Sequence, residues 1–179
     1  MQPQTILHFW FEELTDKQHF AKDAALDEAI RTRFGATLEA AARCELFAWR
    51  ATPDGRLAEI IVLDQFSRNV YRDNARAFAQ DPLALVLAQE LVASTQDRSL
   101  PVAQRIFAYM PCMHSESALV HTQAVALFSQ PGMESNLDFE MRHKAIIDRF
   151  GRYPHRNAIL GRDSTAEELA FLSEPGASF

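Results

Sequence analysis

The chain has little of several features that would assign it to a special class of protein. Its 179 residues include two cysteines, Cys44 and Cys112, whose separation fits neither a metal-ligand nor a redox motif. We therefore expect small, reduced core residues rather than a disulfide framework. No apolar run approaches the roughly 20 residues that a membrane helix needs. The N-terminus has no basic segment before its apolar stretch, so we expect a cytoplasmic protein without a membrane partner.

Positive charge is also in deficit. Lysine and arginine number 18 against 24 acidic residues, which gives a net charge of −6. A nucleic-acid-binding protein needs a broad basic surface, so this balance argues against a nucleic-acid partner. The chain has no HExxH metal motif, no glycine-rich phosphate loop and no serine or cysteine nucleophile signature. The sequence therefore predicts no metal site and no cofactor.

Strand-like alternation is almost absent, whereas helical periodicity runs through the chain. We predict one all-helical domain over residues 1–179, built from about eight helices with short connections. Gly35 and Pro111 are placed to end two of these helices, and an alanine-rich helix is expected over residues 36–50. A turn is expected at Thr52–Gly55, with a helix after it. The other helices are expected to begin after Thr5, Asp23, Asp81, Pro101, Ser115 or Ser117, Ser135 or Asn136, and Ser164.

Two ionisable residues lie where the helical pattern requires apolar ones. Asp64 shares a face with Ile60 and Ile61, and His143 lies four residues from both Phe139 and Ile147. A buried carboxylate without a partner costs several kcal/mol, roughly, so Asp64 must be paired. Arg68, one turn further along, is the local candidate partner, whereas Arg149, Arg152 and His143 are distant ones. Asn69 closes this polar helix end.

A second polar cluster lies near residue 114, where His114 and Glu116 flank the start of a predicted helix. The pair could share a metal or a proton. Glu116 at this position also stabilises the free N–H groups of the helix N-terminus, which is a structural role. Two candidate ligands do not make a metal site, so no metal is assigned here.

The third polar segment is the basic block at residues 149–157, which places three arginines, a histidine and an asparagine around one glycine and one proline. Arginine presents a planar fork of donors that suits carboxylate and phosphate groups. These groups could belong to a ligand, or to Asp64 and Glu116 of the protein itself. The residue before Pro154 is restricted to extended conformations, so the block should hold its side chains in fixed directions.

Taken in order, these blocks resemble a bacterial domain-of-unknown-function family. The resemblance rests on the LDQFSRN segment from Leu63 to Asn69, on Met113-His114-Ser115-Glu116 and on RFGRYPHRN from Arg149 to Asn157. It covers essentially the whole chain, but Cys112 and His121 depart from the family pattern. The resemblance implies stacked antiparallel helical hairpins in a tetratricopeptide-like superhelix, whereas periodicity alone also allows a compact helical bundle. It implies no substrate or reaction.

We predict from these residues a site that binds a small anionic metabolite, with hydrolysis or transfer as the reaction class. Two alternatives remain open. A tetratricopeptide-like module could bind an acidic peptide or a C-terminal carboxylate, and the polar blocks could be purely structural. A protein partner or a homo-oligomer is left open. The candidate catalytic residues are His143, His155 and Asp64, and the candidate binding residues are Arg68, Asn69, His114, Glu116, Arg149, Arg152, Arg156 and Asn157.

Overall fold

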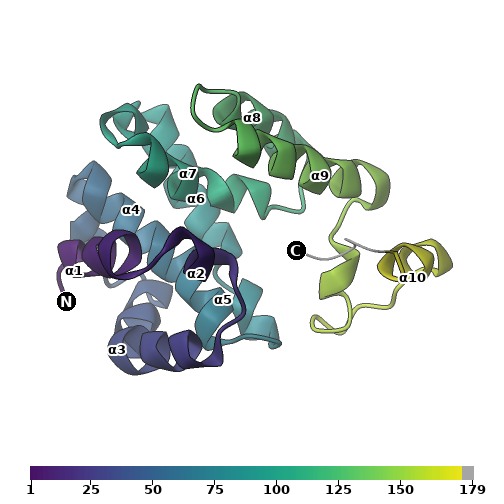
Figure 1. Ribbon diagram of the computed structural model, residues 1–179, viewed down its shortest axis with the longest axis horizontal. Helices are drawn as coiled ribbons and strands as arrows, with labels where there is room; N and C mark the ends of the chain where they lie inside the picture. The colour runs from purple at the N-terminus through teal and green to yellow at the C-terminus, as the bar shows by residue number, and fades with distance from the viewer. Residues whose placement is uncertain (175–179) are drawn as a thin grey trace.

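The computed structural model describes residues 1–174, which form helices and turns without a strand (Figure 1). The all-α class is thus confirmed. Residues 175–179 of the predicted 1–179 domain lie outside the described part. Within that part, no helix is both long enough and apolar enough to cross a membrane.

The α-helices follow one another with short connections. They are α1 (Pro3–His8), α2 (Asp16–Phe20), α3 (Ala24–Ala42), α4 (Pro53–Ile61), α5 (Ser67–Val70), α6 (Asp81–Ala93), α7 (Val102–Met113), α8 (Ala118–Phe128), α9 (Glu134–Phe150) and α10 (Ala166–Leu172). Two π-helical turns, η1 (Phe9–Glu13) and η3 (Val62–Phe66), extend α1 and α4. Short 3₁₀ turns are η2 (Phe47–Ala51), η4 (Ala75–Phe78), η5 (Gln96–Ser99) and η6 (Pro154–Arg156).

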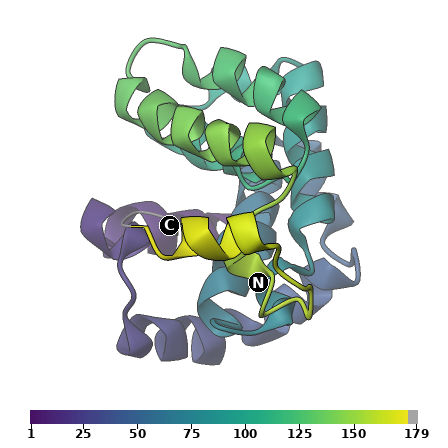
Figure 2. The same cartoon turned by 90° about the vertical axis from the view of Figure 1, so that its right-hand side faces the viewer.

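Helix α4 lies at the centre, because it packs against α1, α6 and α7. Successive helices then pack in pairs, α7 on α8 and α8 on α9. Figure 2 shows α8 and α9 side by side as one layer, with α10 below that layer on the chain that follows α9. Neighbouring antiparallel helices are what short loops favour. The tetratricopeptide-like superhelix stays a prediction.

Part of the main core is a group of aromatic rings between the N-terminal helices and α4. Phe9, Phe34 and Phe66 contact one another there, and the rings of Phe34 and Phe66 are stacked with centroids 5.1 Å apart. Ile6 and Trp10 are fully buried, whereas Thr5, His8 and Glu12 are exposed. The first helical segment therefore buries one face against later helices and leaves the other in solvent, so the prediction of burial on all sides is wrong. Each fully buried side chain of this size contributes about 1.5–3 kcal/mol to folding.

The prediction that Gly35 ends a helix is wrong. Helix α3 runs through it from Ala24 to Ala42, in place of two helices divided at residue 35. Leu26, Ile30, Phe34 and Leu38 keep one buried stripe across the glycine, so packing outweighs the roughly 1 kcal/mol propensity cost of glycine. The predicted helix over 36–50 therefore stops early, and the 3₁₀ turn η2 follows it.

Pro111 does not end its helix either, since α7 continues to Met113. The proline lies in the last turn, where the missing N–H removes a single hydrogen bond. The helix then closes with the N–H of His114 donating to the carbonyl of Met110 at 2.9 Å. Because the helix continues past Pro111, His114 lies directly after its last turn, where the side chain reaches Asp64.

Candidate functional site

The site centres on Asp64, which lies in the π turn η3 and is fully buried. A π turn inserts one extra residue into a helix and recurs at functional sites. The Asp64 Oδ1 atom lies 2.8 Å from Nδ1 of His114 and 3.0 Å from Nη1 of Arg68. Its other oxygen accepts a hydrogen bond from the Gln65 amide at 2.6 Å. Burial alone raises the pKa of Asp64, but Arg68 and His114 outweigh it and hold that pKa below its ordinary value.

His114 follows the last residue of α7 and is held by Asp64 in one tautomer. The ionised carboxylate can only accept, so Nδ1 of His114 must carry the proton and Nε2 is left with a lone pair. Burial, and then the charge of Arg68, lower the pKa of His114, which keeps the ring neutral at pH 7. The side chain is 16% exposed. A neutral imidazole of this kind can accept a proton from a ligand or from water.

Arg68 and Arg156 converge on Asp81, the first residue of α6. Arg68 donates to both Asp81 oxygens at 2.9 and 3.0 Å, and Arg156 reaches one of them at 3.3 Å. The side chains of Arg68 and Asp81 are 21% and 17% exposed, so this edge of the cluster meets solvent. The predicted pairing of Arg68 with Asp64 is confirmed, and Asp81 is an additional partner.

Arg156 is the most buried cation of the cluster. Its guanidinium lies 4.6 Å from the ring centroid of Phe78 and 4.5 Å from that of Tyr153. Its side chain is 8% exposed, and its Nε atom is buried without a hydrogen-bond partner. Burial, and then Arg68, lower the pKa of Arg156. Two aromatic faces and one long hydrogen bond therefore hold this guanidinium, and its unpaired Nε is buried.

The other two arginines of the basic block bind helix α10. Arg152 donates to both carboxylate oxygens of Glu168 at 2.7 and 2.8 Å. Arg149 donates to Glu167 at 2.9 Å and lies largely exposed. The prediction that Asp64 and Glu116 pair with these arginines is wrong, because α10, which follows in sequence, supplies nearer carboxylates. Arg149 and Arg152 thus anchor α10, and of the block's three arginines only Arg156 reaches the Asp64 cluster.

Glu116 forms a second network beside the first. Both of its oxygens bind Arg162, at 2.6 and 2.9 Å, and Oε1 also accepts the backbone N–H of Tyr153 at 2.7 Å. Asn157 completes the network by accepting from Arg162 and donating to Ser164, each at 3.0 Å. Glu116 and Asn157 therefore hold the loop after α9 to the segment that contains His114. This arrangement is a structural brace for the site.

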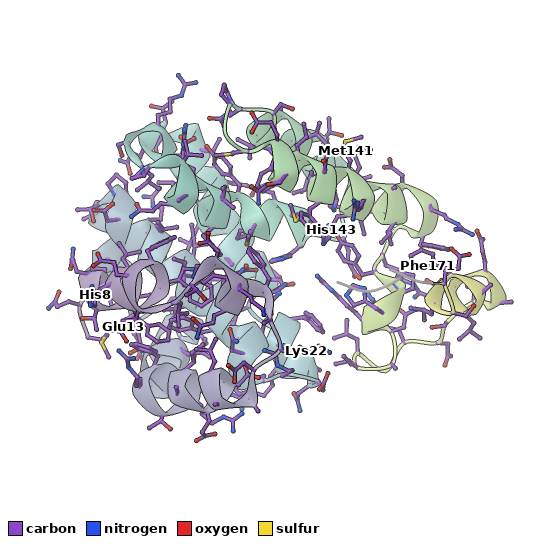
Figure 3. The ribbon with its side chains drawn as sticks, viewed as in Figure 1. His8, Glu13, Lys22, Met141, His143 and Phe171 are labelled. Carbon is purple, nitrogen blue, oxygen red and sulfur yellow. The ribbon has the colours of Figure 1, made fainter. Side chains whose placement is uncertain are left out.

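His143 and His155 lie around the ring of Tyr153. Figure 3 shows His143 on the inner side of α9 and Met141 on the outer side. The centroid of the Tyr153 ring is 5.8 Å from that of His143 and 5.5 Å from that of His155. Burial lowers the pKa of His143 to about 3 and that of His155 to about 4, so both are neutral at pH 7. The histidine that Asp64 bonds is His114, whereas the sequence offers His143 as a distant partner.

Phe139, predicted in the same buried stripe as His143, is instead 51% exposed. The adjacent Glu140 takes the inner position, fully buried, because its carboxylate pairs with His121 on α8 at 2.7 Å. Pairing of this kind offsets the cost of burying a charge, so a polar residue has displaced an aromatic one. Sequence periodicity shows no such preference, and Glu140 was not among the predicted site residues.

Asn69 lies away from the site, although it is one residue from Arg68. Its amide donates to Asp27 on α3 at 2.7 Å, where Arg72 also binds. Two residues that the prediction missed do belong to the site, namely Asp81 and Tyr153. The sequence indicated Asp81 as a helix cap and included Tyr153 only as the residue that precedes Pro154. The aspartate–proline start of α6 was the one available signal for Asp81.

The cluster around Asp64 meets solvent at Arg68 and Asp81, and two hollows lie elsewhere in the described residues. A hollow of about 440 Å³ lies between α6, α7 and α8, and one of about 80 Å³ lies near Tyr71 and Arg76, but neither is lined by Asp64 or His114. Among residues 1–174, no group of three or more His, Cys, Asp or Glu side chains is arranged to hold a metal ion. The chemistry that the site can support therefore rests on Asp64, His114, Arg68 and Arg156.

Comparisons with other proteins place this architecture in a family. Residues 6–176 match the family described as "Bacterial protein of unknown function (DUF924)". A solved structure of a protein of unknown function, ATU0120 from Agrobacterium tumefaciens, is similar with a TM-score of 0.90 and 37% identity over 96% of each chain. A search of curated proteins finds no match. The chain belongs to the DUF924 family of bacterial proteins of unknown function.

Proposed function

We propose that this protein binds a small metabolite with a carboxylate or phosphate group and catalyses its hydrolysis or a group transfer. The observation that carries the proposal is the Asp64–His114 pair, with 2.8 Å between Asp64 Oδ1 and His114 Nδ1, set beside Arg68. A histidine oriented by a buried carboxylate is the arrangement of a general base, and neighbouring arginines are the usual binders of anions. We also propose a cytoplasmic location, where a reducing environment keeps Cys44 and Cys112 as free thiols.

His114 is the catalytic residue in this proposal. Its Nε2 lone pair takes a proton from water or from a hydroxyl of a second substrate, and the freed oxygen bonds to the carbon or phosphorus of the bound group. The bond to the leaving group breaks, and the imidazolium returns the proton to that leaving group. Asp64 is a positioning residue, since it touches the far nitrogen of His114 and stabilises the imidazolium.

Arg156 and Arg68 bind the anion. Arg68 lies at the exposed edge beside His114, and Arg156 lies behind it against the same Asp81 carboxylate. An anion at this edge contacts Arg68 and reaches Arg156 in place of Asp81. Cations placed before the reaction also stabilise charge that builds up during it. Asp81 competes for the same donors, because it is bonded to both arginines. The ligand therefore adds to, or displaces, the Asp81 carboxylate.

The test measures the thermal stability of the wild-type protein with inorganic phosphate, acetate, succinate and a panel of phosphorylated metabolites. A ligand at 100 times its Kd raises the unfolding free energy by about 2.7 kcal/mol. We expect Arg156→Gln to abolish the shift and Arg156→Lys to weaken it. The matched control is Arg149→Gln, whose arginine pairs with Glu167 at the surface and whose loss leaves the shift intact.

A compound that binds is then tested for turnover by the wild type and by His114→Gln. Loss of turnover with retained binding in His114→Gln supports the catalytic role. If no compound of either class stabilises the wild-type protein, or if Arg156→Gln and Arg149→Gln respond alike, the proposal is wrong.

A further inference from the structure

The two backbone carbonyls on either side of His114 are held by buried side chains. The Tyr153 hydroxyl donates to the carbonyl of Met113 at 2.6 Å, and Nε2 of His121 lies 2.8 Å from the carbonyl of Ser115. Tyr153 and His121 are both fully buried, and their polar atoms lie 3.2 Å apart. Side-chain hydrogen bonds therefore restrain the backbone on both sides of His114, one from Tyr153 after α9 and one from His121 on α8.

The protonation of His121 follows from its neighbours. A carbonyl oxygen only accepts, so Nε2 of His121 must carry a proton to bond Ser115. The Tyr153 proton is already directed to Met113, so the phenol oxygen accepts from the same Nε2–H. On the other side of the ring, Nδ1 lies 2.7 Å from Oε1 of Glu140, which requires a further proton between these two atoms. Glu140 therefore either keeps that proton or pairs with an imidazolium, and in both cases Nε2–H points at Ser115.

Burying the His121–Glu140 pair costs free energy that an apolar pair would not cost. His121 and Glu140 are both 0% exposed, and the Glu140 Oε2 atom is buried without a hydrogen-bond partner. An unsatisfied buried acceptor costs about 1–3 kcal/mol, and an apolar pair of similar volume often gives equal or better stability. Packing of α8 on α9 alone does not require these two residues. Their specific effect is a directed N–H at the Ser115 carbonyl.

We propose that His121 and Tyr153 are positioning residues that keep the His114 imidazole against Asp64, with Glu140 fixing the proton of His121. This inference rests on the proposed role of His114 and deepens it. Helix α7 ends at Met113, so His114 lies in the turn to α8 without a full set of helical hydrogen bonds. The two side-chain bonds supply the missing restraint. A displacement of about 1 Å at a reacting group is enough to cost about 100-fold in rate.

The test follows His114 itself by NMR, so it needs neither a ligand nor a known reaction. The ¹⁵N shifts of its ring nitrogens report the tautomer, and their titration reports its pKa. Three variants are compared with the wild type. Tyr153→Phe removes one hydroxyl, His121→Leu removes the N–H, and His121→Gln is the conservative variant whose amide can still donate to the Ser115 carbonyl.

We expect the wild-type protein to hold His114 as the Nδ1–H tautomer, with a lowered pKa. In Tyr153→Phe and His121→Leu the ring should lose this single tautomer, and its pKa should move towards the ordinary value. His121→Gln should behave as the wild type. If His121→Leu fails to fold, the comparison of Tyr153→Phe with His121→Gln still decides the matter.

An unchanged His114 tautomer and pKa in folded Tyr153→Phe and His121→Leu would overturn the positioning role. That outcome is separate from failure of the proposed function. A protein that binds no anion but releases His114 in these variants retains the positioning role and loses the catalytic one. If the wild type turns over an anion while the His114 tautomer and pKa are unchanged in these variants, the catalytic role stands and the positioning role is wrong.

Discussion

The side chains of Asp64 and His114 meet at 2.8 Å although 50 positions separate them in the chain. The contact joins the centre of the fold to the end of α7, because Asp64 lies in the π turn that continues α4. The contact also fixes the tautomer of His114, whose side chain is 16% exposed and lies beside Arg68.

Asp64→Asn should be strongly destabilising. The substitution keeps the shape of the side chain but removes its charge, which leaves Arg68 without one of its two carboxylates and His114 without an anionic acceptor. Breaking a buried ion pair on one side costs about 3–5 kcal/mol, and urea unfolding measures it. Glu45→Gln is the control, because its pair with Arg43 is exposed and should contribute nothing measurable. Equal stability of Asp64→Asn and the wild type would contradict the assignment.

Stability should fall as the pH drops from about 6.5 towards 4. Burial lowers the pKa of His143 to about 3 and that of His155 to about 4, so the unfolded chain binds protons in this window that the folded protein rejects. This destabilisation disappears above about pH 6.5, because both histidines are then neutral in the folded and in the unfolded state. Each histidine adds up to about 1.4 kcal/mol per pH unit to the slope.

Urea unfolding of the wild type and of His143→Gln between pH 7.5 and about 4.5 checks this dependence. The variant should show a shallower slope, since one of the histidines with a lowered pKa no longer titrates. Carboxylates with a lowered pKa, such as Glu116, act in the same direction at the acid end of this range. They act equally in both proteins, so the difference between the two curves reports His143. Parallel curves for the two proteins would show that His143 is not the group responsible.

Arg152→Gln should release α10 without disturbing the Asp64 cluster. Arg152 holds Glu168 through two hydrogen bonds, and Glu168 also accepts from the backbone N–H of Thr165 at the start of α10. We expect faster hydrogen exchange across α10 and an unchanged tautomer at His114. Arg156→Gln should leave hydrogen exchange across α10 unchanged, because Arg156 bonds Asp81 in the Asp64 cluster and not α10. Were anion binding lost in Arg152→Gln, the assignment of Arg152 to structure rather than to the site would be incorrect.

Two glycines in helices should respond oppositely to alanine. At Gly55, an added Cβ would lie 2.1 Å from the carbonyl oxygen of Trp49, and backbone cannot give way as a side chain can. Gly55→Ala should cost about 3 kcal/mol, the upper end for overpacking. At Gly35, within α3, nothing lies within 4 Å of the added atom, so Gly35→Ala should gain about 0.5–1 kcal/mol. Thermal unfolding of the two variants checks both signs.

Sequence reasoning identified the parts of the site that depend on local spacing. Helical periodicity placed Asp64 and His143 inside, and the i+4 relation paired Asp64 with Arg68. Both results need only the geometry of one helix. The all-helical class follows in the same way, from periodicity that persists along the chain.

Long-range partners could not be found in this way. Nothing in the sequence distinguishes the carboxylates available to Arg149, Arg152 and Arg156, because each arginine accepts any carboxylate that the fold brings near. The helix ends were misjudged at Gly35 and Pro111 for a related reason. Buried stripes that continue past these residues outweigh their local propensity, and that burial is a tertiary effect.

The π turn at residues 62–66 has a consequence for how neighbouring positions are interpreted. One extra residue in a helix shifts the register of all that follows by about 100° relative to an unbroken α-helix. Beyond Phe66, a helical wheel drawn from α4 therefore assigns faces incorrectly. The shifted segment serves two separate neighbours, as Arg68 turns to Asp81 and Asn69 to Asp27. Deleting a single residue within 62–66 should therefore unpair both contacts at once, although neither contact lies in the deleted segment.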